Sequence, residues 1–192
     1  AENINIDLTN PVITVASRTS ANANGWNKGD VTVKYSVSDL LSGVDTIAGG
    51  YEDNTISSEG SGMSVIGLVR DLAGNTASMI IGNINIDKTA PVISLSSRLP
   101  EANSFGWNKS AVTVKYSMSD ALAGIDTVAG GYEDDVVNSE GANQSVSGSV
   151  TDKAGNGSNI TISNIKIDKT IPIITILSLV GIVPRHKNLK SR

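Results

Sequence analysis

The chain has 192 residues, of which 19 are acidic and 15 are basic, and its net charge is −4. It contains no cysteine, which excludes a disulfide framework, thiolate catalysis and the usual cysteine-ligated zinc sites. The single histidine, His186, lies close to the C-terminus, so the body of the chain cannot hold a serine–histidine–aspartate triad, and we expect no enzyme activity. An acidic surface repels phosphate backbones, and we therefore expect no nucleic-acid partner.

The sequence contains an internal duplication, in which residues 8–87 recur as residues 88–168. The segment Gly25-Trp26-Asn27-Lys28, for example, returns as Gly106-Trp107-Asn108-Lys109. Units of this length are too long for a solenoid repeat but long enough to close a small core of their own. Tandem copies of one domain are typical of proteins that provide reach, spacing or multivalent contact.

A proline-containing segment marks each domain entry. Asp87-Lys-Thr-Ala-Pro91 is echoed by Asp7-Leu-Thr-Asn-Pro11 and by Asp168-Lys-Thr-Ile-Pro172. Proline fixes φ and keeps the preceding residue extended, which predicts short and stiff junctions. The predicted divisions are residues 1–7 as the end of a preceding repeat's last strand, 8–87 as repeat 1, 88–168 as repeat 2, and 169–192 as the start of a truncated third repeat plus a basic tail.

Short strands separated by Gly, Asn, Ser and Asp clusters account for each repeat. Residues 31–38 alternate strictly, with Val31, Val33, Tyr35 and Val37 on one face and polar side chains on the other, as in a half-buried strand. No segment shows a helical period, so the fold class is all-β, with six to seven strands per repeat in an antiparallel sandwich. In repeat 1 we expect strands at residues 12–15, 31–38, 43–47, 63–70 and 76–86.

A tight hairpin joins the last two strands of each repeat. Asp71-Leu-Ala-Gly-Asn75 returns as Asp152-Lys-Ala-Gly-Asn156. Glycine there can take positive φ, and the leading aspartate can accept hydrogen bonds from backbone N–H groups of the turn.

These motifs together resemble one known family. The Asp-Lys-Thr-Ala-Pro entry, the Gly-Trp-Asn-Lys lead-in, the corner at residues 38–44, the Ser-Glu-Gly turn at 58–60 and the Asp-x-Ala-Gly-Asn hairpin resemble bacterial Ig-like repeats of secreted and cell-surface proteins, over residues 1 to about 178. The resemblance implies two tandem immunoglobulin-like antiparallel β-sandwiches, extracellular and non-catalytic, that act as a stalk, spacer or adhesive module. The chain departs from the pattern at Ala123, which replaces Ser42, and over residues 177–192.

Aspartates recur at the domain entries, corners and hairpins. Hard oxygen ligands that converge at a domain end are what Ca²⁺ requires, although the same aspartates can simply cap turns without a metal. No cofactor is required by this composition, and calcium is the candidate ligand. The candidate metal ligands are Asp7, Asp39, Asp71, Asp87, Asp120, Asp152 and Asp168.

Two further sets of residues are candidates for binding. Trp26, Trp107, Tyr51 and Tyr132 could stack on a sugar, or could instead anchor the repeats by packing. On the strand before the first hairpin, Ile66 and Leu68 should face outward, with Ile80 opposite Ile66 on the next strand. Repeat 2 has Ser147, Ser149 and Thr161 at these positions, so the apolar set of repeat 1 suggests a contact surface for a neighbouring chain or partner domain.

The segment 171–183 is apolar and precedes a basic tail. It is too short to span a bilayer, so we expect a strand and no membrane anchoring, with a short surface anchor as the alternative. Partners are expected to be neighbouring Ig-like repeats or other proteins, including other copies of the chain. Two alternatives to a stalk remain open: a self-assembling filament subunit that exchanges the terminal strands 1–7 and 169–180, and a carbohydrate-binding accessory module of a secreted enzyme.

Overall fold

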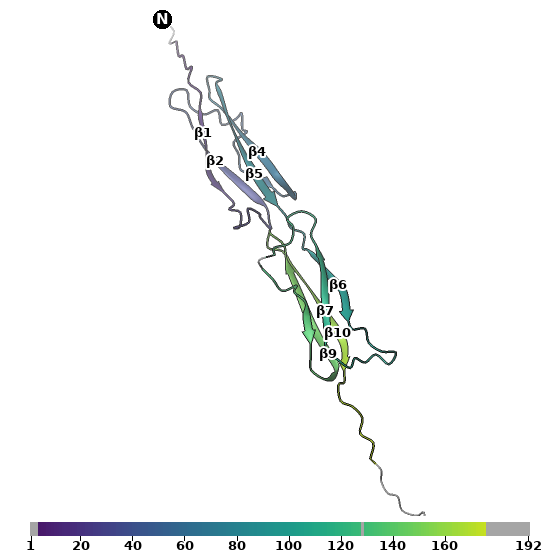
Figure 1. Cartoon of the computed structure of the whole chain (residues 1–192). Coiled ribbons are helices and arrows are strands. Elements are labelled where there is room, and N and C mark those ends of the chain that lie inside the picture. Colours follow the sequence, from purple (N-terminus) through teal and green to yellow (C-terminus); the bar gives the residue numbers. More distant parts are fainter. Residues whose placement is uncertain (1–3, 128, 176–192) are drawn as a thin grey trace, which may run out of the picture.

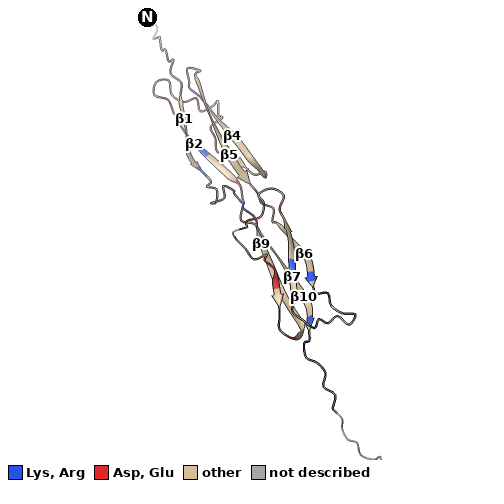
Figure 2. Cartoon of the chain, viewed as in Figure 1, with Lys and Arg blue, Asp and Glu red and all other residues tan. Residues whose placement is uncertain are grey.

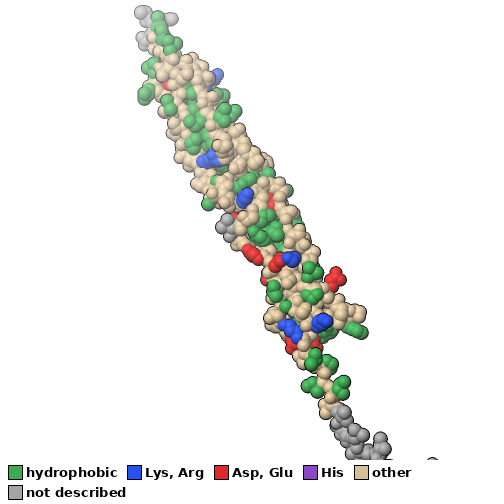
Figure 3. All heavy atoms as spheres, in the orientation of Figure 1, with side chains coloured by type: hydrophobic (Ala, Val, Ile, Leu, Met, Phe, Trp, Pro, Cys, Tyr) green, Lys and Arg blue, Asp and Glu red, His purple; other side chains and the backbone are tan. Residues whose placement is uncertain are grey.

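The computed structural model describes residues 4–127 and 129–175. Within them the chain is all-β, with ten strands and no helix. The strands form two halves, β1 to β5 and β6 to β10, which lie end to end in an elongated rod (Figure 1). The space-filling view shows the same narrow outline (Figure 3).

Two small sheets face each other in the first half. One sheet has the order β1 (Val12–Arg18), β2 (Val31–Ser38) and β3 (Asn54–Ile56), and the other is the hairpin of β4 (Gly60–Arg70) and β5 (Thr76–Ile86). All neighbouring strands are antiparallel. The core lies between the sheets, where valines of β2 pack against isoleucines of β5; its buried members are Val31, Val33, Ile81, Ile84 and Ile86.

The second half repeats this arrangement. Its sheets are β6 (Val92–Leu99), β7 (Val112–Ser119) and β8 (Asp135–Val137), and β9 (Gly141–Thr151) with β10 (Gly157–Ile167). Even the irregularities recur, since β1 and β6 both shift register against their partner, between Val15 and Ser17 and between Leu95 and Ser97. Each half is therefore a β-sandwich with its own core.

The predicted alternation along β2 is confirmed. Val31 and Val33 are fully buried, whereas Lys34 and Ser36 are exposed. The predicted pairing on the second sheet is also confirmed, because Ile66 lies opposite Ile80 in the β4–β5 ladder. In repeat 2 the corresponding pair is Ser147 and Thr161.

A tyrosine on the central strand packs across each sandwich onto a glycine. In repeat 2 the Tyr116 hydroxyl donates a 2.6 Å hydrogen bond to Oδ2 of Asp135. Burial, and then this hydrogen bond, raise the pKa of Tyr116 to about 12. A Cβ on Gly148 would lie 2.8 Å from Cζ of the same ring, so only glycine leaves room for it.

The expected strand at residues 43–47 does not form. Only an isolated bridge between Val44 and Asp71 is present there, and the described residues of each half form five strands instead of six to seven. Gly43 has φ +84°, and Asp39 and Asp45 accept hydrogen bonds from the backbone of residues that follow them. These local bonds hold turns on both sides of the bridge and limit the pairing with the second sheet to two backbone hydrogen bonds.

The terminal segments are not strands in the described part of the chain. Residues 4–7 and 169–175, which the sequence predicts to belong to strands of incomplete repeats, have no ladder partner among the described residues. Residues 176–192, which include most of the apolar segment 171–183 and the basic tail with His186, lie outside the described residues. Within the described residues, no helix has the length and hydrophobicity needed to cross a membrane.

Candidate metal centres and the junction between repeats

Three aspartates meet at the same end of each repeat. The first cluster is Asp7, Asp39 and Asp71, and the second is Asp87, Asp120 and Asp152. In each cluster one residue comes from the domain entry, one from the corner after the central strand and one from the hairpin. One carboxylate oxygen per residue lies within 4.8 Å of the other two.

The hairpin aspartates are buried and fully hydrogen-bonded. Asp71 is 1% exposed; its Oδ1 accepts from the backbone N–H of Asn75 at 2.8 Å and its Oδ2 accepts from the Asn75 amide at 2.7 Å. Asp152 makes the same two bonds with Asn156. These bonds fix the turn in which Gly74 takes φ +100°, as the sequence predicts.

The entry aspartates join each domain entry to the domain that follows. Oδ2 of Asp87, which is fully buried, accepts from the backbone N–H of Ala123 at 2.8 Å, and the Asn156 amide donates to the Asp87 carbonyl at 2.9 Å. Asp7 accepts from the backbone of Ser42 in the same way. Hydrogen bonding to Ser42, and then to the backbone of Thr9, lowers the pKa of Asp7.

The corner aspartates have an oxygen to spare. Oδ1 of Asp39 accepts from the backbone of Leu41 and Gly43, and Oδ1 of Asp120 accepts from the backbone of Leu122 and Gly124. No described residue donates a hydrogen bond to Oδ2 of either side chain. Three convergent carboxylates with a spare oxygen are ligands of the kind that Ca²⁺ takes, although the surrounding N–H donors also stabilise the negative charge.

Six of the seven candidate ligands lie in these clusters, and Asp168 does not. It lies in the third proline-containing segment, and among the described residues its Oδ1 accepts from the backbone of Thr170, at 2.9 Å. No corner or hairpin aspartate of a further repeat lies among the described residues to complete a cluster there.

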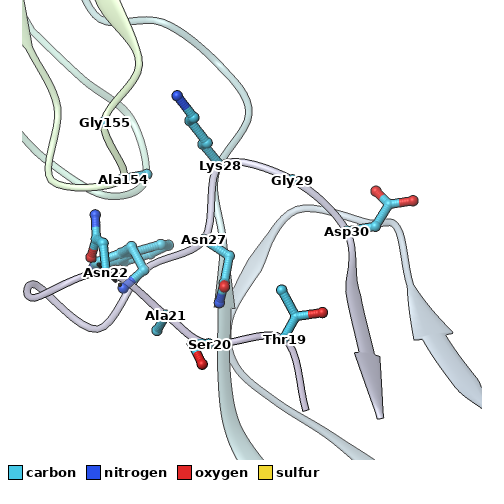
Figure 4. A pocket seen from close by; sticks show the side chains of 11 residues that line it. Thr19, Ser20, Ala21, Asn22, Asn27, Lys28, Gly29, Asp30, Ala154 and Gly155 are labelled. Carbon is cyan, nitrogen blue, oxygen red and sulfur yellow. Dashed lines mark hydrogen bonds between the residues drawn. The ribbon is translucent and has the colours of Figure 1, made fainter. Parts of the chain in front are cut away.

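The junction between the repeats is built from a loop of repeat 1 and the hairpin of repeat 2. The Asn22 amide donates a 2.8 Å hydrogen bond to the Lys153 carbonyl, and the Asn24 amide donates to the same carbonyl at 3.3 Å. Trp26 lines a cleft of about 490 Å³ together with Ala154 of this hairpin, and Figure 4 shows the hairpin above the loop. Sequence reasoning missed this contact.

The linker is also fixed to repeat 1. Nζ of Lys88 lies 2.6 Å from Oδ1 of Asp30, and the backbone N–H of Lys88 donates to Glu59. The Lys88 ammonium lowers the pKa of Asp30, and hydrogen bonding to the Lys88 backbone lowers the pKa of Glu59. Elsewhere the charged residues are dispersed, and Figure 2 shows lysines and arginines on strands of both halves, separated by uncharged stretches.

The aromatic candidates do not form one platform. Trp26 lies at the junction, Trp107 lines a separate cleft at the far end of repeat 2, and Tyr51 and Tyr132 are half-buried in the long loops before β3 and β8. The outer-face set is exposed as predicted, with Ile66 at 59%, Leu68 at 48% and Ile80 at 70%.

No protein-family model matches the chain, and no curated protein matches it either. Among solved structures, one described as "Structures of Clostridium thermocellum CbhA fibronectin(III)-like modules" is similar over 86% of this chain and 100% of that chain. The sequence identity is 11% and the TM-score is 0.37. The similarity is distant, and the strand pairing and the two cores alone define the fold.

Proposed function

We propose that this chain is a tandem pair of immunoglobulin-like domains, residues 8–87 and 88–168, which serves as a non-catalytic stalk, spacer or adhesive module of a secreted or cell-surface bacterial protein. The observation that carries the proposal is the junction, where loop, linker and hairpin hold the two repeats in line. A spacer needs a fixed separation between the parts that it joins, and a flexible link would not provide one.

The junction has two independent attachments. The linker is bonded to repeat 1 through Lys88 and to repeat 2 through the Asp87 side chain. Beside it, Asn22 bridges directly from the loop to the hairpin. Two attachments side by side resist both bending and rotation, whereas a single linker would act as a hinge.

Small-angle X-ray scattering of the whole chain tests this function. We expect the wild-type curve to fit one extended conformation, and the double variant Asn22→Ala, Asn24→Ala to show a broader distribution of distances. Asn103→Ala is the matched control, because Asn103 holds the equivalent loop of repeat 2, which contacts no other repeat among the described residues. A broad distribution in the wild type would rule out a rigid spacer.

We also propose that the two aspartate clusters bind calcium. Support comes from the convergence of three carboxylates and from the spare oxygens of Asp39 and Asp120. A cation there would remove the repulsion between carboxylates and would stabilise the end of each repeat that meets its neighbour.

Calorimetric titration with Ca²⁺ and thermal unfolding with and without EDTA test the metal. We expect heat of binding that Asp120→Asn reduces, and a lower melting temperature after chelation, because a ligand bound only by the native state stabilises it. Asp53→Asn is the control, since Asp53 forms an exposed ion pair with Lys34 away from both clusters. No heat and an unchanged melting curve would leave the aspartates as turn caps alone.

A further inference from the structure

The two outer ends of the described rod carry the same parts as the internal junction. At the far end of repeat 2, Oδ1 of Asn103 accepts from the backbone of Phe105 and Trp107, as Oδ1 of Asn22 does from Asn24 and Trp26. Phe105 therefore occupies the place of Asn24. At the opposite end of the chain, Leu72 follows the hairpin aspartate as Lys153 does at the junction.

The outer ends carry apolar side chains where the junction carries polar ones. Inside the chain the Asn24 amide meets the backbone of Lys153. At the outer ends the same two places hold Phe105, which is 82% exposed, and Leu72, which is 67% exposed. The side chains at both places differ from those of the junction and are apolar, and Phe105 is the single phenylalanine of the chain.

Other positions at the N-terminal end of the rod show the same change. Leu8 stands where repeat 2 has Lys88, and Leu40 stands where it has Ala121; both leucines are almost fully exposed. With Leu72, which stands where repeat 2 has Lys153, they give this end three leucines that repeat 2 lacks, beside Leu41, whose counterpart is Leu122. Exposed leucines clustered in this way mark a contact surface, whereas single ones do not.

A hollow with both polar and apolar lining lies at this end. It has a volume of about 700 Å³, and its lining residues are Ile4, Asn5, Ile6, Asp7, Leu41, Ser42, Leu72 and Ala73. Ala73 is exposed there, whereas its counterpart Ala154, which lines the junction cleft with Trp26, is only 4% exposed. The equivalent surface is thus covered inside the chain and open at its end.

We propose that copies of this chain associate head to tail, with the loop 103–107 of one copy against the corner 40–42 and hairpin 71–75 of the next. Phe105 then lies against Leu72 and fills the hollow, and Trp107 covers Ala73 as Trp26 meets Ala154. The two surfaces differ, so the contact is heterologous and does not close on itself, and it produces linear assemblies.

Only the loop-and-hairpin part of the junction can be repeated between copies. Inside the chain Asp87 ends one repeat and enters the next, but between copies Asp7 already holds the entry position of the receiving copy. The donor's residues 168–175 must therefore pass beside it. This inference extends the stalk function, because a chain that stays monomeric would still be a two-domain spacer.

Sedimentation velocity of the full chain, from micromolar to near-millimolar concentration, tests the association. The diagnostic variants are Phe105→Ala and Leu72→Ala, which remove the two apolar side chains from the contact. We expect each to weaken the association about tenfold, as the loss of a central anchor does. Val136→Thr is the control, because Val136 is 62% exposed on β8 and repeat 1 has Thr55 there.

Engineered cysteines test the polarity of the contact, because the chain has none of its own. Under mild oxidation Phe105→Cys and Leu72→Cys should cross-link when mixed, and neither should cross-link efficiently alone. A wild-type monomer at every concentration, an association unaffected by both diagnostic variants, or cross-linking of each cysteine variant only with itself would overturn the proposal.

Discussion

Gly148 is a position at which one added methyl group should be costly. The change is Gly148→Ala, whose Cβ would lie 2.8, 2.9 and 3.0 Å from three atoms of the Tyr116 ring. The ring cannot move away easily, because Tyr116 is 8% exposed and its hydroxyl is bonded to Asp135. Forcing extra atoms into a packed core costs about 1–3 kcal/mol, and the fixed ring places this variant in the upper half of that range.

The measurement is urea unfolding of the full chain, followed by Trp107 fluorescence in a Trp26→Phe background. Gly157→Ala in the same repeat is the matched control, because its Cβ would meet nothing closer than 3.7 Å. We expect the control to change the free energy of unfolding by less than about 0.5 kcal/mol. Equal effects of the two variants would show that Tyr116 does not pack on Gly148 as described.

Three further predictions concern the hairpins, Tyr116 and the outer sheet face. Gly74→Ala should destabilise repeat 1 alone by about 1 kcal/mol, because φ is +100° there, whereas Gly155→Ala should also loosen the junction that its hairpin contacts. Differential scanning calorimetry separates the two effects, and identical profiles for the two variants would contradict the assignment of the junction to the second hairpin. The Tyr116 hydroxyl should stay neutral in the folded state until the pH approaches its pKa of about 12. Because this pKa is raised above the unfolded value of about 10, the contribution of the neutral hydroxyl to stability is complete below pH 10 and is lost as the pH rises through 12. Absorbance titration of phenolate formation, compared with Tyr116→Phe, checks this, and ionisation of all four tyrosines near pH 10 would refute it. Replacing Ile66, Leu68 and Ile80 by Ser, Ser and Thr should change the free energy of unfolding by less than about 1 kcal/mol and should weaken lateral contacts made by that face of the sheet. A larger loss of stability in urea would show instead that these three side chains belong to the core.

The strands and hairpins were predictable because their signals are local. The period-2 pattern from Val31 to Val37 identifies the buried face of β2, and the glycine and aspartate of residues 71–75 specify the turn between β4 and β5. The prediction of a strand at residues 43–47 was wrong because the apolar residues of this segment lie between turn formers. Backbone hydrogen bonds accepted by the Asp39 and Asp45 side chains favour turns over the strand.

The sites were less predictable because they depend on distant contacts. The recurrence of aspartates identifies six residues that do converge, but it also includes Asp168, which has no cluster to join within the described residues. Asn22 is an ordinary turn residue by sequence, and its partner across the junction is the backbone carbonyl of Lys153. Every residue has such a carbonyl, so no side-chain pattern could have indicated this pairing.

Asp87 determines how a pull along the chain would pass from one domain to the next. Its backbone N–H donates to the Asn27 carbonyl of repeat 1 at 2.9 Å, while its side chain is bonded to Ala123 of repeat 2. Tension along the chain therefore acts on Asp87 through the hydrogen bond of its backbone N–H to repeat 1 and through the hydrogen bond of its carboxylate to repeat 2. These two hydrogen bonds resist the separation of the linker from repeat 1 and from repeat 2, so one residue couples the two sandwiches mechanically.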